Sequence, residues 1–295
     1  MSLRHLTWLT KKDFIFKLYS KFFETDMLDR AAQVAFYFSF SLFPLLFFLI
    51  SLFGLLLEST ENLRHELFSY LFQIMPRSAY DLVQRTVDEI VESSSTGKLT
   101  VGMLITLWSA SAGMDSLRAA LNSVYQLKET RTWFHTKGLA LALTLLSIVL
   151  IGLALTIVFY GWQSIQVAIA LFGFEVTSPL VLVSLQWTTI LLLMLFACEV
   201  IYNLMPNFHP FRWVWVTPGS IVAILMWIIF TGGFRLYLQY FNAYNKTYGS
   251  LGAVIILMLW LYLSAVAVLL GGAINSVLTE MEGPAGPKPG GEESQ

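Results

Sequence analysis

Stretches without a charged residue alternate along this chain with shorter polar stretches. A helix needs about 20 consecutive apolar residues to cross the hydrocarbon core of a bilayer, and most of the charge-free stretches reach that length. The pattern therefore predicts an all-α, polytopic membrane protein with six transmembrane helices. The predicted spans are about 31–57, 99–120, 138–160, 179–198, 213–234 and 247–279.

The last span has small residues towards both of its ends. Gly249 and Gly252 lie near its beginning and Gly271 and Gly272 near its end, with large side chains between them. Small residues let helix backbones approach closely inside a membrane, where hydrophobic burial cannot drive helix pairing. We therefore expect this helix to pack against other helices at both ends.

The second span has two interpretations. Its charge-free part, 99–114, is short and rich in small and hydroxyl side chains. It is either one helix that continues past the bilayer into Asp115 and Arg118, or a broken helix that lines a cavity. The single helix is favoured because broken spans are the rarer case.

Prolines and segment length set further boundaries. Pro44 lies inside the first span and removes a backbone hydrogen-bond donor, which predicts a kink. Pro206, Pro218 and Gly219 are also predicted to be structural. The charge-free stretch 138–174 is too long for one perpendicular helix at about 1.5 Å per residue, so it is divided into the third span and an interfacial helix.

Three polar segments lie outside the spans. Residues 1–30 carry lysines and aromatic residues at helical spacing and predict a cytoplasmic amphipathic leader, which either stays in solvent or binds lipid. Residues 58–98 hold two amphipathic pieces separated by Pro76 and predict an extracytoplasmic helical pair. Residues 281–295 are rich in proline and glycine and predict a disordered cytoplasmic tail.

The distribution of basic residues predicts the orientation. Of the 18 lysines and arginines, 12 fall in segments that are cytoplasmic when the N-terminus is cytoplasmic, and 6 fall on the other side. Cytoplasmic segments of membrane proteins carry the excess of lysine and arginine. Both termini are therefore predicted to lie in the cytoplasm.

Composition and motifs argue against catalysis. The chain is 56% hydrophobic and only 13% charged, whereas soluble domains are about 25% charged. No nucleotide-binding or serine-hydrolase motif occurs, and the histidines lack metal-ligand spacing. The single Cys198 excludes an internal disulfide. We expect no enzymatic activity, no metal, no cofactor and no nucleic-acid partner. The histidines are His5, His65, His135 and His209.

The charged residues associated with the spans lie only at span ends. Such residues either reach the interface and pair locally, or they converge on a polar cavity open to one leaflet. Asp115 and Arg118 are three residues apart and could satisfy each other, while asparagines could bond between helices or belong to a transport path. The candidate substrate-path residues are Asp115, Arg118, Asn122, Glu199, Asn203, Arg235 and Asn275.

Five segments carry a family resemblance: 30–46, 108–131, 202–207, 216–227 and 248–275. In these segments the sequence resembles the YihY/virulence factor BrkB family of bacterial inner-membrane proteins, once labelled ribonuclease BN. The resemblance implies six helices in the bacterial cytoplasmic membrane, a link to the envelope, and proposed transport that includes lipid-like substrates.

The resemblance departs from the family pattern near the end of the last span. The family commonly has a Gly-Ala-Glu sequence there, where this chain has Gly271, Gly272 and Ala273. A carboxylate-based coupling step at that position is therefore not expected.

The main functional hypothesis is a transporter or flippase-like protein for an amphipathic or lipid-linked substrate. Its motivation is the combination of charge-free helix centres with charged groups near the interfaces. The alternatives are a non-transporting scaffold involved in envelope integrity, and an ion/proton antiporter. The expected partners are membrane lipids and a lipid-linked substrate, and a homo-oligomer is left open.

Overall fold

The computed structural model describes residues 12–58, 96–170, 178–209, 211, 213–240 and 250–281. Every regular element in these ranges is an α-helix, which confirms the all-α prediction for this part of the chain. The predicted helical pair of 58–98 lies almost entirely outside these ranges, as do the tail 281–295 and Gly249.

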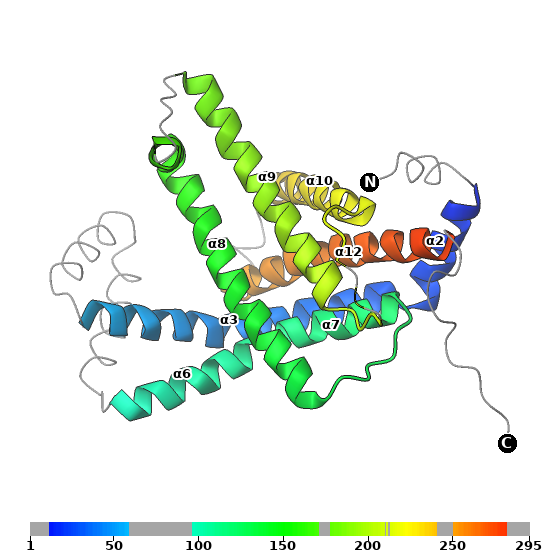
Figure 1. Cartoon of the computed structure of the whole chain (residues 1–295), viewed down its shortest axis with the longest axis horizontal. Helices are drawn as coiled ribbons and strands as arrows, with labels where there is room; N and C mark the ends of the chain where they lie inside the picture. Colours follow the sequence, from blue (N-terminus) through cyan, green and yellow to red (C-terminus); the bar gives the residue numbers. More distant parts are fainter. Residues whose placement is uncertain are drawn as a thin grey trace. The chain divides into compact units, whose positions relative to one another are not determined.

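The described chain forms eight helices, which Figure 1 labels. It divides into two compact units, one made of Tyr37–Met114 and the other of Met1–Phe36 with Asp115–Gln295. We describe each unit by itself and call the second the long unit. The helices are α2 (Lys12–Glu24), α3 (Met27–Glu58), α6 (Thr96–Ala110), α7 (Ala112–Val124), α8 (Trp133–Ala170), α9 (Pro179–Leu204), α10 (Pro218–Tyr240) and α12 (Ser250–Met281).

Four helices of the described chain are long and apolar enough to cross a membrane, judged by length and composition. The apolar segments are Trp133–Val158, Leu180–Leu204, Pro218–Gln239 and Val254–Met281. They correspond to the last four predicted spans. The first two predicted spans fall on α3 and on α6 with α7, and their membrane crossing stays a prediction.

Two helix ends differ from the predicted span limits. The fourth predicted span ends near residue 198, whereas α9 continues to Leu204 and ends just before Pro206. The fifth predicted span begins at residue 213, whereas α10 begins at Pro218. Proline suits the first helical position, where no backbone donor is needed. Thr217 precedes it, and its Oγ1 accepts a hydrogen bond from the Ser220 N–H at 3.2 Å, which is helix N-capping.

Interruptions occur in two helical segments. Gly161 has φ 50° and ψ −125° inside α8, a conformation that glycine adopts readily, and this agrees with the predicted division of 138–174. The second predicted span is interrupted for one residue at Ser111, between α6 and α7, which departs from the favoured single helix. That this segment lines a cavity stays a prediction. The Ser111 hydroxyl donates to the Trp108 carbonyl at 2.7 Å, and such bonding often bends helices. By contrast, α3 is one helix from Met27 to Glu58 with Pro44 inside it.

In the unit of Tyr37–Met114, a hydrogen bond joins α3 to the beginning of α7. The Gly113 N–H donates to the Ser41 hydroxyl at 3.1 Å. A Cβ on Gly113 would lie 3.0 Å from the Phe38 ring, so the absence of a side chain allows this approach. Much of the apolar surface of the unit is exposed, including Phe40, Leu104 and Ile105.

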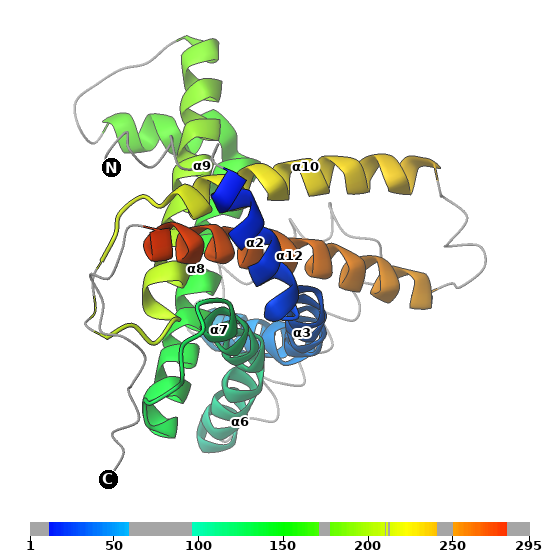
Figure 2. The ribbon, with the colours of Figure 1, turned by 90° about the vertical axis from the view of Figure 1, so that its right-hand side faces the viewer.

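In the long unit, the membrane-length helices form two antiparallel pairs, α8 with α9 and α10 with α12. Figure 2 shows α10 and α12 side by side over most of their length. Helix α9 also contacts α10, and α2 packs against α12. The core beneath α2 contains the buried side chains of Phe14, Ile274, Val277 and Leu278.

Candidate functional site

Helices α10 and α12 are in direct backbone contact where two glycines meet. A Cβ on Gly219 would collide with the Gly271 carbonyl oxygen, and a Cβ on Gly271 would lie 2.5 Å from the Gly219 oxygen and 2.8 Å from the Ala223 Cβ. Only glycine allows this crossing. On Gly272, a Cβ would lie 2.9 Å from Leu121 of α7. The predicted structural role of these three glycines therefore has a geometric basis at this end of α12.

The beginning of α10 is bonded by side chains from two other helices. The Thr217 N–H donates to Glu199 Oε1 at 2.7 Å, and the Thr217 hydroxyl lies 3.1 Å from the same oxygen. Asn275 Oδ1 accepts from the Gly219 N–H at 2.8 Å, and Asn275 Nδ2 donates to Thr217 Oγ1 at 3.0 Å. The first N–H groups of a helix have no partner within the helix, so Glu199, Thr217 and Asn275 satisfy groups that burial would otherwise leave unpaired.

Two more side chains of α9 extend these contacts. Asn203 Oδ1 accepts from the Val214 N–H at 2.8 Å, and Asn203 Nδ2 donates to the Val214 carbonyl at 3.0 Å. The Tyr202 hydroxyl donates to the Val268 carbonyl of α12 at 2.7 Å. The end of α9, the beginning of α10 and the second half of α12 thus form one hydrogen-bonded cluster. We call it the polar junction, and its side chains are Glu199, Tyr202, Asn203, Thr217 and Asn275.

Glu199 is the charged group of the polar junction. Its side chain is 2% exposed, and the structure records no lysine or arginine paired with it among the residues it describes. An isolated buried carboxylate is costly. Here the N–H and hydroxyl of Thr217 replace water, and the positive end of the α10 dipole favours negative charge.

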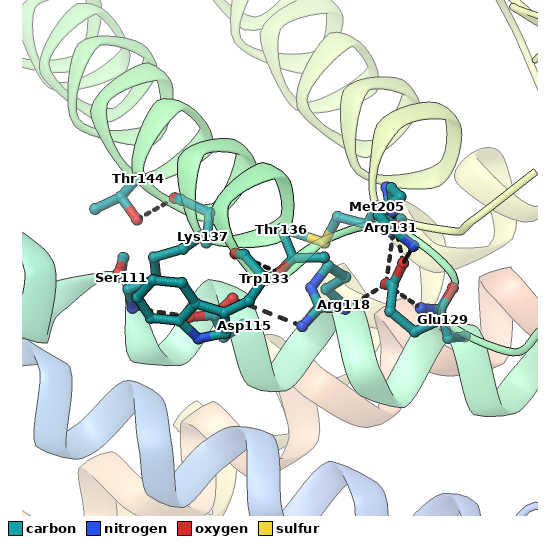
Figure 3. A network of polar contacts seen from close by, with 12 residues as sticks. Ser111, Asp115, Arg118, Glu129, Arg131, Trp133, Thr136, Lys137, Thr144 and Met205 are labelled. Carbon is teal, nitrogen blue, oxygen red and sulfur yellow. Dashed lines mark hydrogen bonds and ion pairs between the residues drawn. The ribbon is translucent and has the colours of Figure 1, made fainter.

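Charged and amide side chains form a network on the connection between α7 and α8, which Figure 3 shows from close by. We call it the ion network, and its side chains are Asp115, Arg118, Asn122, Glu129, Arg131 and Lys137. Glu129 accepts from Arg118, from Arg131 Nε at 2.8 Å and from Asn122 Nδ2 at 3.0 Å. The hydrogen bonds from Arg131 are the main cause that lowers the pKa of Glu129 to about 2, against partial burial that raises it. Glu129 is therefore the shared acceptor of Arg118, Asn122 and Arg131.

Arg131 also bonds the end of α9. Its guanidinium donates to the Leu204 carbonyl at 3.2 Å and to the Met205 carbonyl at 2.7 Å. These carbonyls lie at the negative end of the helix dipole, where a cation is favourable. Asn207 adds a second connection, because its N–H donates to Asn122 Oδ1 at 2.9 Å. The α7–α8 connection is thus fixed to the residues that follow α9.

Asp115 pairs with a different partner from the one suggested by its spacing. Lys137 Nζ lies 2.9 Å from Asp115 Oδ2, whereas Arg118 lies 3.8 Å from Asp115 and is bonded to Glu129. The local i, i+3 pair is therefore the weaker contact. The principal ion pair of Asp115 connects α7 to the first turns of α8.

Tyr125 lies between the polar junction and the ion network. Its ring packs edge-on against Phe208 at a centroid distance of 5.0 Å. Burial raises the pKa of the Tyr125 hydroxyl above its usual value, a hydrogen bond with Asn275 lowers it in part, and the charge of Glu199 raises it. Tyr125 is therefore neutral at physiological pH, and it brings the end of α7 to the polar junction.

The predicted candidate residues fall into two adjoining groups and one separate residue. Glu199, Asn203 and Asn275 belong to the polar junction, and Asp115, Arg118 and Asn122 belong to the ion network. Arg235 does not join them. It lies 17 residues after Pro218, so the rise of α10 places it roughly 25 Å from the polar junction. Arg235 lines a shallow hollow with Thr231, Phe234, Leu238 and Gln239.

Sequence reasoning did not single out Tyr125, Glu129, Arg131 or Thr217 as site residues. Thr217 had a usable signal, because threonine directly before proline is typical of a helix N-terminus. The others had none, since their partners lie far away in sequence. The residues that the structure describes contain no group of three or more histidine, cysteine, aspartate or glutamate side chains placed to hold a metal ion.

Comparison with known proteins identifies the family. The family model described as virulence factor BrkB matches residues 18–295. The ribonuclease-like protein YfkH of Bacillus subtilis (strain 168) is 31% identical over 265 residues, which cover 90% of this chain and 94% of the relative. A UPF0761 membrane protein of Xanthomonas campestris pv. campestris (strain B100) is 27% identical over 267 residues.

The relatives differ in length. The match to the Xanthomonas campestris protein covers 89% of this chain but only 60% of the relative. A UPF0761 membrane protein of Xanthomonas oryzae pv. oryzae (strain PXO99A) is 28% identical and is covered over 59% of its length. No solved structure matches the chain. The family match over almost the whole chain, together with the apolar helices, shows that this chain belongs to the virulence factor BrkB family of membrane proteins.

Proposed function

We propose that the chain is a six-span transporter of the flippase type in the bacterial inner membrane, and not an enzyme. Its substrate is an amphipathic or lipid-linked molecule with a polar headgroup. The observation that carries this proposal is the separation of polar and apolar surface in the long unit. The ion pairs of the described residues lie at one end of its membrane-length helices.

The polar end offers the chemistry that a headgroup requires. The ion network and the polar junction supply cations, a carboxylate, amides and hydroxyls within a few residues of the helix ends. Charged groups within a membrane protein are costly, and they commonly mark a path for a polar substrate. A headgroup that exchanges hydrogen bonds with these groups would avoid part of the cost of leaving water.

The remaining lengths of the helices offer apolar surface. Val149 and Leu153 of α8, and Leu180, Leu191 and Leu192 of α9, are exposed in the described chain. A large exposed apolar surface marks contact with lipid or with an apolar ligand. Acyl chains along these helices, with the headgroup at the polar end, fit an amphipathic substrate.

The proposed topology places the polar end in the cytoplasm. The six spans comprise α3, α6 with α7, and the four membrane-length helices, so both termini and the α7–α8 connection lie on one side. That connection carries basic residues and ends in the exposed Trp133 and Phe134, and both features are typical of a cytoplasmic interface. A cysteine placed at Ser94 in a Cys198→Ser background should react with an impermeant thiol reagent in intact cells. Reaction only after lysis would reverse the orientation.

Glu199 favours a second candidate function, ion/proton exchange. A buried carboxylate without a paired lysine or arginine among the described residues is the usual mark of an ion or proton site in a membrane protein. A pH-sensitive dye inside proteoliposomes would detect it as proton movement driven by an imposed cation gradient. The scaffold alternative depended on the helical pair of 58–98, which lies almost entirely outside the described residues.

Lipid scrambling in proteoliposomes tests the main proposal. Vesicles contain dye-labelled lipids of several headgroups, including one with an isoprenoid chain, and a membrane-impermeant reductant bleaches the label in the outer leaflet. The protein should increase the bleached fraction beyond the outer-leaflet half for at least one headgroup. Equal bleaching with and without protein for every headgroup would overturn the flippase proposal.

A matched pair of variants tests the site. Glu199→Gln removes the charge but keeps an oxygen that can accept from the Thr217 N–H, and it should slow scrambling. Glu24→Gln removes an exposed carboxylate on α2, whose partner is Ser20, and it should leave the rate unchanged. An unchanged rate in a folded Glu199→Gln protein would exclude the polar junction from the substrate path.

A further inference from the structure

Helix α2 divides its surface into three stripes with different environments. Phe14, Leu18 and Lys21 face α12. Phe14 is buried in the core with Ile274, Val277 and Leu278. Positions four and seven residues apart lie on the same face of a helix, so a single inner face makes these contacts.

The other two stripes lie outside this inner face. One is polar, with Asp13, Lys17 and Glu24 at helical spacing beside Lys21. The other is apolar and exposed, with Ile15, Phe16, Tyr19 and Phe23, of which Phe16 is 73% exposed and Tyr19 64%. At about 100° per residue, the polar stripe borders the inner face and the apolar stripe lies mostly on the opposite side of the helix. The Tyr19 and Phe23 rings also contact each other at a centroid distance of 4.7 Å. Packing against α12 explains the inner face but not this exposed apolar stripe.

Lys21 fixes the direction of the stripes relative to α12. Its side chain is 4% exposed, and its Nζ donates to Ser276 Oγ at 2.5 Å and pairs with Glu280. Ser276 and Glu280 lie in the last turns of α12. The polar stripe adjoins Lys21 and therefore borders the contact with the last turns of α12. The apolar stripe lies on the side of α2 that is turned away from α12 and from the polar stripe.

The length of α12 gives the depth at which α2 lies. The helix has 32 residues and is therefore about 48 Å long, whereas the hydrocarbon core is about 30 Å thick. The ends of α12 must therefore reach the borders of the hydrocarbon or pass them. The residues that contact α2 therefore lie at the edge of the hydrocarbon. Figures 1 and 2 both show α2 running across the end of α12 and not along it.

We propose that α2 is an in-plane membrane helix whose Ile15, Phe16, Tyr19 and Phe23 insert into the lipid leaflet beside the end of α12. The partner is the lipid monolayer itself. The exposed apolar stripe then faces lipid, and the polar stripe stays in water, as in other interfacial amphipathic helices. The contacts of Lys21 hold α2 at this depth. The inference rests on the membrane location of the long unit and does not require transport.

Site-directed spin labelling tests this proposal in the full chain. Single cysteines replace Tyr19 or Lys17 in a Cys198→Ser background, and the protein is reconstituted in vesicles of phosphatidylethanolamine and phosphatidylglycerol. Collision rates with oxygen, which concentrates in lipid, and with a water-soluble nickel complex are then compared. The oxygen-to-nickel ratio should be several-fold higher at position 19 than at position 17. The matched positions 23 and 24 should repeat the contrast.

Two results would overturn the proposal. Equal nickel access at positions 17 and 19 would place the whole of α2 in water. Low access of both reagents at position 19 would mean that protein, such as a second copy of the chain, covers the apolar stripe. A Lys21→Met variant adds a separate measure. Without the contacts of Lys21, α2 should no longer be held at one depth in the membrane, and the difference in oxygen-to-nickel ratio between positions 17 and 19 should decrease. The result does not depend on scrambling, so this inference and the proposed function can fail separately.

Discussion

Replacement of Gly271 by alanine gives the most direct test of the polar junction. The added methyl group would lie 2.5 Å from the Gly219 oxygen and 2.8 Å from the Ala223 Cβ, and it would also meet the Tyr202 hydroxyl. Two of these contacts are to atoms on or next to the backbone, so a change of rotamer cannot relieve them. Helices α10 and α12 must therefore separate, and the bond from the Gly219 N–H to Asn275 must lengthen.

The expected cost follows from three effects. Overpacking of a well-packed core costs about 1–3 kcal/mol, and each weakened hydrogen bond, from Gly219 to Asn275 and from Tyr202 to Val268, adds about 0.5–1.5 kcal/mol. Alanine is about 0.5–1 kcal/mol more favourable than glycine inside a helix, which offsets part of this cost. Gly271→Ala should therefore lower the free energy of unfolding by about 1–5 kcal/mol.

Thermal unfolding of purified protein, followed by tryptophan fluorescence, measures this effect. Gly232→Ala is the matched control, because it lies in α10 and a Cβ there has nothing within 4 Å. It should melt at or slightly above the wild-type temperature, and Gly271→Ala should melt several degrees below it. If Gly271→Ala melts at or above the wild type, the close approach of α10 and α12 is refuted.

Three further predictions address the polar contacts. Thr217→Val removes a hydroxyl that contacts Glu199, Asn275 and the Ser220 N–H, and it should lower the free energy of unfolding by about 2–4 kcal/mol. Thr217→Ser keeps the hydroxyl and should retain most of the wild-type stability. Equal melting temperatures of the two variants would contradict this. Glu129 has a pKa of about 2 against an ordinary value of 4.5, so the stability that its carboxylate adds to the fold is fully present above pH 4.5 and is lost as the pH falls towards 2. The melting temperature of Glu129→Gln should therefore depend less on pH in this window than that of the wild type. Lys21→Met should lower the melting temperature modestly, because its partner Glu280 is half-exposed, and limited proteolysis should then cut near α2 sooner than in the wild type.

The hydrophobic pattern predicts the helices well because each apolar stretch must be buried or face lipid along its whole length. It predicts their ends less well. The fourth predicted span ends directly before Glu199, and a charge inside a membrane helix is costly. The structure removes part of that cost through Thr217, which is 18 residues away, and α9 therefore continues. A sequence shows where a charge lies but not which groups satisfy it.

Long-range partners explain what sequence reasoning missed at the site. Arg131 bonds carbonyls 73 and 74 residues away, and no local spacing indicates such contacts. Arg235 is different, because the sequence could have excluded it. The predicted topology already put the end of the fifth span on the opposite side of the membrane from the ends of the second and fourth. Convergence of Arg235 with Asp115 and Glu199 was therefore inconsistent with that topology.

The position of the polar junction limits how a transporter of this construction could move. Glu199, Tyr202 and Asn203 join the α8–α9 pair to the α10–α12 pair at one end of the helices. A rotation between the pairs would therefore have its pivot there. Helix α10, with 23 residues, is about 35 Å long, so a rotation of about 10° would move its far end by roughly 6 Å. Transport motion should accordingly be largest near Arg235 and smallest near Thr217. When substrate is added, the distance between spin labels on α9 and α10 should change more at the end of the helices near Arg235 than at the end near Thr217.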